Sequence, residues 1–295
     1  MRVAAIVLAV LVIVFGLTID TFLDLDNLSL VVQQSLVIGT LALGQLLVVR
    51  AAGIDLANAA IAVFATLLIA KLTIIGTSGA VALVVGIVAA VAISGVTGGL
   101  VTWLRLPPFI VTLGMLTIVT SVSQIYAQGQ SFPVTDGTLG WLGTAKYLFG
   151  RVEVTYGMAV MLVMVVGLWF ALRKSAWGKQ DLPHQTILSV YLVAGLCYGI
   201  AAWQALGRVP SADPNAFQLG NLDSITAVLI GGASLAGGRG GVAGTVIGAL
   251  IVAVLRSGLS QTGLNSLYQD LAVGALLIMA VAVDRFLREK QVTDQ

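Results

Sequence analysis

Long apolar runs separated by short polar segments make up nearly the whole chain. About ten of these runs are candidates for membrane helices, at residues 3–19, 29–49, 55–76, 79–104, 109–127, 154–172, 187–206, 222–236, 241–257 and 266–283. About 20 apolar residues cross a bilayer as a helix. The run at 222–236 is short, so a broken helix or a re-entrant element also fits it. The pattern predicts an all-α polytopic membrane protein with about ten transmembrane helices, in a single domain over residues 1–295.

The composition excludes several classes of protein. Of the 295 residues, 58% are hydrophobic and 9% are charged, whereas soluble domains carry about 25% charged residues. A large soluble catalytic domain is therefore excluded, and the net charge of +2 gives no reason to expect nucleic-acid binding. Cys197 is the single cysteine and His184 the single histidine, so neither an intrachain disulfide nor a multi-histidine metal site is possible.

The basic residues are distributed unevenly along the ten-helix pattern. With the N-terminus in the cytoplasm, ten Lys and Arg residues lie at cytoplasmic helix ends and five at the opposite ends. The first external loop carries Asp20, Asp24 and Asp26 and no basic residue. The positive-inside rule therefore predicts that both termini are cytoplasmic. Residues 3–19 lack a clear cleavage site, which favours a retained helix over a signal peptide.

An aspartate interrupts the apolar pattern between the second and third runs, in Gly53-Ile54-Asp55-Leu56. A carboxylate at membrane depth is costly unless it is solvated, paired or hydrogen-bonded. One interpretation is that Asp55 caps the following helix, and Arg50 is close enough in sequence to pair with it. The other is a direct role in transport.

A second interruption is Pro107-Pro108-Phe109, between the fourth and fifth runs. Two prolines end one helix and suit the first turn of the next. They are therefore either a plain helix–helix connection or part of a broken helix that lines a cavity.

Glycine is concentrated between residues 231 and 241. The segment lacks the strand that a dinucleotide-binding motif requires, and no phosphate-binding loop occurs in the chain, so we expect a flexible turn between two membrane segments. Gly240, Gly244 and Gly248 recur every four residues, which predicts close helix packing. No nucleophile–base group, paired carboxylates or metal cluster is evident, so the sequence predicts neither an enzyme nor a metal site. Membrane carboxylates are too few to favour a proton-coupled carrier.

Taken together, the motifs resemble the ribose-type permease subunits of bacterial ABC importers. The matching segments are Gly53-Ile54-Asp55-Leu56, Pro107-Pro108-Phe109-Ile110-Val111-Thr112-Leu113-Gly114, Ser211-Ala212-Asp213-Pro214 with Leu222-Asp223, and the segment from Gly231 to Gly240. The segments occur in the family's order and cover nearly the whole chain.

The resemblance implies a multi-pass permease of the bacterial inner membrane that translocates a sugar or related small polar solute. The implied partners are a second permease copy or paralogue, a periplasmic sugar-binding protein, membrane lipid, and ABC ATPase subunits that use the ATP, while this chain binds no cofactor. The residues that the resemblance assigns to the pathway are Gly53, Ile54, Asp55, Leu56, Pro107, Pro108, Phe109, Thr112, Gly114, Gly231, Gly232, Ser234, Gly237, Gly238 and Gly240.

One loop departs from the family's pattern. The cytoplasmic loop that holds the ATPase-docking helix begins here at Trp177-Gly178-Lys179, but Asp181 leads almost at once into the next apolar run. Roughly 15–20 residues of the family's loop are absent, which leaves too little length for a full docking helix. The alternatives to a coupled importer are therefore an ATP-uncoupled sugar channel and a degenerate subunit that does not transport. Pentoses, hexoses and polyols all remain open as substrates.

Overall fold

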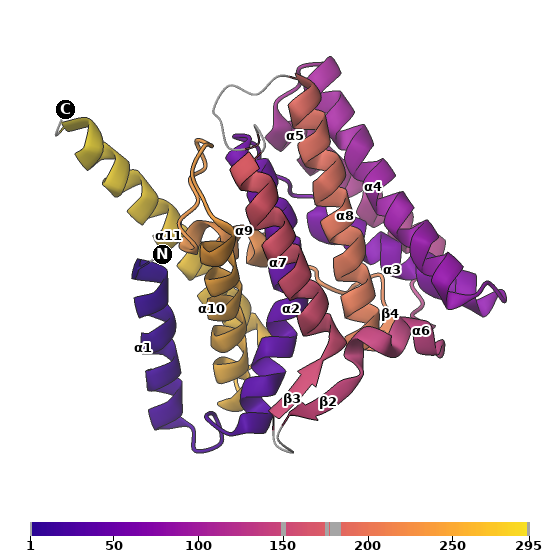
Figure 1. Cartoon of the computed structure of the whole chain (residues 1–295), viewed down its shortest axis with the longest axis horizontal. Helices are drawn as coiled ribbons and strands as arrows, with labels where there is room; N and C mark the ends of the chain where they lie inside the picture. Colours follow the sequence, from indigo (N-terminus) through magenta and orange to yellow (C-terminus); the bar gives the residue numbers. More distant parts are fainter. Residues whose placement is uncertain (1, 149–151, 175–176, 178–183, 294–295) are drawn as a thin grey trace.

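A bundle of long helices forms the body of the protein in this computed structural model, which describes residues 2–148, 152–174, 177 and 184–293 (Figure 1). The helices are α1 (Arg2–Thr18), α2 (Leu25–Arg50), α3 (Asn58–Ile74), α4 (Gly79–Trp103), α5 (Pro108–Ala127), α6 (Gly137–Gly140), the 3-10 helix η1 (Trp141–Gly143), α7 (Tyr156–Lys174), α8 (His184–Arg208), α9 (Gly220–Ile230), α10 (Val242–Gln261) and α11 (Ser266–Thr293). Each predicted apolar run coincides with one of these helices.

The helical, polytopic class is confirmed, but the expected number of crossings is not supported by helix length. Within the described residues, six helices are long and apolar enough to cross a membrane: α2, α4, α5, α7, α8 and α10. Four more apolar helices are shorter, at Val3–Thr18, Asn58–Ile74, Gly220–Ile230 and Ser266–Ala282. The hydropathy of the sequence located these segments correctly, but the helices α3 and α9 are shorter than the apolar runs that predicted them.

Short strands depart from the all-α prediction. β1 (Phe132–Pro133) pairs antiparallel with β4 (Ser211–Ala212), and β2 (Ala145–Leu148) pairs with β3 (Val152–Thr155). The first pair joins two loops that the sequence places far apart, so no local pattern could reveal it. Both pairs lie with α6 at one end of the bundle, which we call the sheet end (Figure 1).

The opposite end carries the α4–α5 connection, the glycine-rich segment 231–241 and the last turns of α11 (Figure 1). We call it the loop end. The core lies between the two ends, around α2, which contacts α3, α7, α8, α9 and α10. Tyr191 and Tyr198 of α8 are among the largest fully buried side chains, and the apolar core extends from α2 to both sides of them.

Glycines allow the closest helix contacts, as the stripe on α10 predicts. A Cβ placed on Gly248 would lie 1.9 Å from the carbonyl oxygen of Ala227, and one on Gly244 would lie 2.1 Å from that of Gly231. Only a residue without a side chain permits α9 and α10 to approach so closely. Gly240, however, lies before α10 begins, so it is not part of this helix face.

Asp136 ties two segments together at the sheet end. Its carboxylate accepts hydrogen bonds from the backbone N–H of Thr138 at 2.8 Å and from that of Gly79 at 3.1 Å. Desolvation by burial acts to raise the pKa of Asp136, but these hydrogen bonds outweigh it and hold the pKa below its ordinary value. The start of α4 and the start of α6 are therefore held by one side chain.

Candidate functional site

Asp55 lies in the break between α2 and α3 and is fully buried. One carboxylate oxygen accepts a hydrogen bond from the backbone N–H of Ala57 at 2.9 Å, and the other accepts one from the hydroxyl of Tyr198 at 3.0 Å. The side chain thus fixes the turn that starts α3 and joins it to α8. Arg50 does not pair with Asp55 but donates to the carbonyl oxygen of Gly240.

The proline motif is joined to the same break. Pro108 is the first residue of α5 and Pro107 precedes it, so the two prolines lie in the connection that leaves α4. One turn further on, the hydroxyl of Thr112 donates to the carbonyl oxygen of Ile54 at 2.8 Å. Phe109 and Gly114 instead lie on the exposed face of α5, and nothing lies within 4 Å of a Cβ placed on Gly114.

The glycine-rich segment is an ordered loop rather than the flexible turn that its composition suggested. The backbone N–H of Gly238 donates to the carbonyl oxygen of Arg50 at 2.9 Å, and that of Ser234 donates to the carbonyl oxygen of Arg239 at 3.2 Å. Gly237 has a φ of +83° and lies against Ala52, where a Cβ would come within 2.9 Å of the neighbour's Cβ. Glycine is therefore required both for the turn and for the contact.

Three of the sequence motifs consequently meet around the end of α2. The segment Gly53–Leu56 follows that end, and Thr112 of the proline motif bonds to this segment from α5. From the glycine-rich loop, Gly237 and Gly238 contact the end of α2, whereas Gly231 and Gly232 follow the last turn of α9. Leu56 also accepts a hydrogen bond from Asn221 of α9 at 3.2 Å. Asn221 lines the first of the two large cavities described below. The other residues line neither cavity and shape the frame of the molecule at the loop end.

The predicted ATPase-facing loop is described only at Trp177, whose indole N–H donates to the hydroxyl of Ser189 at 3.0 Å. Gly178, Lys179 and Asp181 lie outside the described residues. The structure ends α7 at Lys174 and begins α8 at His184. The missing docking helix therefore stays a prediction.

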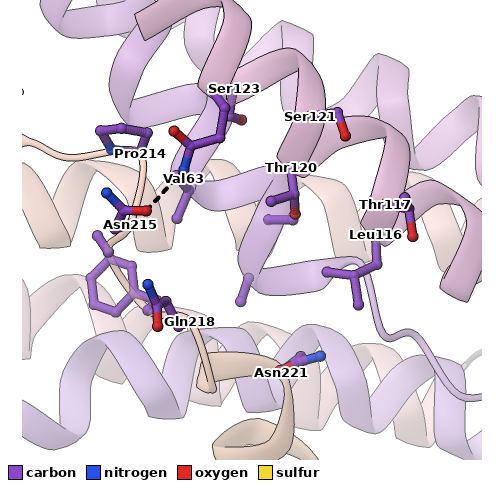
Figure 2. A pocket seen from close by; sticks show the side chains of 15 residues that line it. Val63, Leu116, Thr117, Thr120, Ser121, Ser123, Pro214, Asn215, Gln218 and Asn221 are labelled. Atoms are coloured by element: carbon purple, nitrogen blue, oxygen red, sulfur yellow. Dashed lines mark hydrogen bonds between the residues drawn. The ribbon is translucent and has the colours of Figure 1, made fainter. Parts of the chain in front are cut away.

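The first cavity, of about 440 Å³, lies between α3, α5 and the segment that leads into α9 (Figure 2). Hydroxyl and amide side chains line it, and none of its lining residues in the described chain is charged. These polar side chains belong to Thr117, Thr120, Ser121, Ser123, Gln124, Asn215, Gln218 and Asn221. The amide of Gln124 donates to the side-chain oxygen of Asn215 at 2.9 Å, which fixes the cavity rim (Figure 2).

Sequence reasoning missed this cavity, although a signal was present. Thr117, Thr120, Ser121 and Gln124 follow the spacing i, i+3, i+4 and i+7, which places them on one face of a helix. A polar stripe along an otherwise apolar membrane helix indicates a face that does not meet lipid.

The second cavity, of about 550 Å³, lies between α2, α9, α10 and α11. It shares Asn215, Phe217 and Gln218 with the first cavity. Arg256 of α10 forms ion pairs here with Asp223 at 2.8 Å and with Asp270 at 3.0 Å. Asp223, part of the Leu222-Asp223 segment of the family resemblance, lies in the first turn of α9 and pairs with Arg256 of α10.

Chemically, both cavities offer hydrogen bonds rather than reactive groups. Among the residues that the structure describes, no cluster of three or more His, Cys, Asp or Glu side chains could hold a metal ion.

Comparisons with known proteins place the chain among transport permeases. The family described as branched-chain amino acid transport system / permease component matches residues 27–180. The fructose import permease protein FrcC of Rhizobium meliloti is 35% identical, over 96% of this chain and 85% of the relative. The ribose import permease protein RbsC of Bacillus subtilis is 30% identical, over 94% and 90%, and the D-allose transport system permease protein AlsC of Escherichia coli is 29% identical, over 95% and 90%. No solved structure matches.

Proposed function

This chain belongs to the family of transport permease components that includes the fructose, ribose and D-allose import permeases, and on that premise we propose that it is the membrane-spanning subunit of an ATP-driven, binding-protein-dependent importer that carries a sugar or related small polar solute. It is a transport subunit and not an enzyme, and the ATP is hydrolysed on separate partner chains.

The uncharged lining of the first cavity carries the proposal of a sugar. The family description names branched-chain amino acids, but a zwitterionic amino acid would need charged partners at membrane depth. The cavity instead offers hydroxyl and amide groups from α5 and from the segment before α9, which match the hydroxyl groups of a neutral sugar as donors and acceptors. The relatives that span most of the chain are named for sugars, which supports the same choice.

We place the protein in the bacterial inner membrane with the loop end and both termini in the cytoplasm. Arg50, Arg105 and Arg239 lie in segments of the loop end, which agrees with the positive-inside rule. The six long and four shorter apolar helices then make ten passages. Although α9 has only 11 residues, the segment that precedes it starts at the sheet end and so completes that passage.

Each partner has a surface in this arrangement. The sheet end receives the periplasmic binding protein, and the loop end faces the ATPase subunits. The ATPase-facing residues expected from the sequence are Trp177, Gly178, Lys179 and Asp181, of which the structure describes Trp177. The exposed face of α5, where Gly114 lies, meets a second permease copy or paralogue, and the remaining apolar surface meets lipid. The relatives that cover 94–96% of the chain are import permeases, so an uncoupled channel or a degenerate subunit is not favoured.

Reconstitution tests the proposal directly. The chain is placed in proteoliposomes with its ATPase and binding protein, and uptake of radiolabelled D-fructose, D-ribose and D-allose is measured with and without ATP. We expect uptake of at least one sugar that requires both ATP and the binding protein. Uptake that needs neither would identify a channel, and uptake of leucine but of no sugar would reassign the substrate class.

A further inference from the structure

The second cavity has a chemical character that the proposed pathway does not use. It is separated from the first cavity by a single short segment, Asn215–Gln218, which contributes to both linings. Phe217 of this segment has a φ of +53°, a left-handed conformation that is uncommon for a bulky residue. The side chain packs against both large apolar clusters of the protein. The partition between the cavities is therefore a fixed structural feature.

Ionisable groups inside a membrane protein are costly and generally mark a functional site. Two cations and two carboxylates line the second cavity: Arg208, Arg256, Asp223 and Asp270. Their formal charges cancel, because the two positive charges equal the two negative ones. A ligand without net charge leaves this balance unchanged, whereas a ligand with a net charge of either sign would add a charge that has no opposite partner in the cavity.

Several hydrogen-bonding groups of this cavity remain unused within the described part of the chain. Asp223 and Asp270 each give one carboxylate oxygen, Oδ1, to Arg256, and Oδ2 of each has no hydrogen-bond partner there. The guanidinium of Arg208 likewise has no partner among the described residues. The amides of Gln34, Gln218 and Gln269 also line the cavity. Donors without partners and acceptors without partners thus border the same space, together with the ring of Phe217.

We propose that the second cavity is a separate binding site for a neutral polyhydroxylated solute, so that the permease holds two solute sites on either side of Phe217. A sugar hydroxyl both donates and accepts. It can donate to the carboxylate oxygens and accept from Arg208 without adding charge, and Phe217 supplies an apolar face for the carbon side of the sugar ring. This inference rests on the proposed function, because it assigns the same solute class to a second site.

Site-specific protection from alkylation tests each cavity separately. In a Cys197→Ala background, Ser260→Cys introduces a thiol at the second cavity and Thr120→Cys introduces one at the first; Ser260 and Thr120 are both exposed. Each full-length variant is placed in nanodiscs and treated with a polar maleimide over a range of D-fructose, D-ribose or D-allose concentrations. D-gluconate and D-glucosamine are the charged probes, one anionic and one cationic.

We expect a neutral sugar to slow alkylation at both positions with different half-protecting concentrations, and the charged probes not to protect Ser260→Cys. Arg208→Gln removes a side chain that has no hydrogen bond or ion pair within the described chain. It should raise the half-protecting concentration at Ser260→Cys about tenfold, the usual scale for losing a hydrogen bond to a charged group. It should leave Thr120→Cys unchanged. Arg105→Gln, a substitution at the opposite end of the bundle, serves as the matched control and should change neither.

Protection of Thr120→Cys alone would overturn the second site while leaving the proposed function intact. An equal shift at both positions in Arg208→Gln would also overturn it, because the two cavities would then act as one site. Stronger protection by D-gluconate or D-glucosamine would overturn the neutral solute class. If neither position is protected but ATP-driven uptake proceeds in the reconstituted importer, only the second site is rejected. If uptake is also absent, the proposed function is rejected as well.

Discussion

The helices α2 and α5 have the same mean hydropathy but very different places in the molecule. In the most apolar 18-residue stretch of α2, 78% of the residues are buried inside the protein, against 28% in that of α5. In water, equally apolar helices would be buried to a similar extent, because apolar surface avoids solvent. In a membrane, lipid is as apolar as a leucine side chain, so hydropathy does not separate the inside of the protein from its outside.

Packing and polar contacts distinguish the two helices instead. On α2, Gly44 lies against α8, and the hydroxyl of Thr40 donates to Oε1 of Gln204 at 2.7 Å, with both side chains buried. On α5, Gly114 borders open space, and Thr117 faces the first cavity. The same residue types therefore hold helices together on α2 and border open space or a cavity on α5.

The largest expected difference comes from replacing one glycine on each helix by leucine. A Cβ on Gly44 would lie 2.5 Å from Cε1 of Tyr198 and 3.1 Å from the carbonyl oxygen of Ala194. Overpacking of this kind costs about 1–3 kcal/mol, and a leucine is among the larger insertions. We expect Gly44→Leu to lower the thermal unfolding midpoint and the yield of monodisperse protein in detergent.

The matched change, Gly114→Leu, should leave the unfolding midpoint of the isolated chain unchanged. If a second permease covers this face of α5, the leucine will lower the fraction of dimer measured by multi-angle light scattering. Equal destabilisation by both substitutions would mean that burial inside this chain does not explain the difference between the helices.

A smaller difference is expected from removing one hydroxyl on each helix. Thr40→Val leaves the acceptor of Gln204 without its buried donor, which costs about 1 kcal/mol in a membrane protein. Thr117→Val removes a hydroxyl that bonds only to the carbonyl oxygen of Leu113 in its own helix, so stability should not change. Since Thr117 lines the first cavity, we expect Thr117→Val to raise the KM for sugar uptake severalfold. Unchanged uptake kinetics in Thr117→Val would argue against a solute path along α5.

This comparison also shows what the sequence reveals about the molecule. Apolar runs located every long helix, and the spacing of Gly244 and Gly248 predicted a close helix contact, because both depend on residues close together in sequence. The structure identifies α9 as the partner in that contact. The second cavity could not be predicted in this way. Its ion pairs join Asp223, Arg256 and Asp270 from three helices, and only the tertiary arrangement brings them together. The first cavity is predictable only in part. Its polar stripe on α5 is visible in a short stretch of sequence, but its opposite wall comes from segments far away in the chain.

The smallest expected difference comes from changing the shape of one apolar side chain on each helix while its volume stays the same. Leu43 of α2 is fully buried, whereas Ile125 of α5 is 75% exposed. Protein interiors are packed as densely as organic crystals, so moving one methyl branch lowers the free energy of unfolding. For Leu43→Ile this loss should be less than about 1.5 kcal/mol but measurably more than zero. Lipid chains are fluid and adapt to either side chain, so Ile125→Leu should leave the unfolding midpoint within experimental error. Thermal unfolding of both variants in the same nanodiscs measures the difference. A lower midpoint for Ile125→Leu, seen only in assembled dimers, would show that a partner chain and not lipid packs against this end of α5.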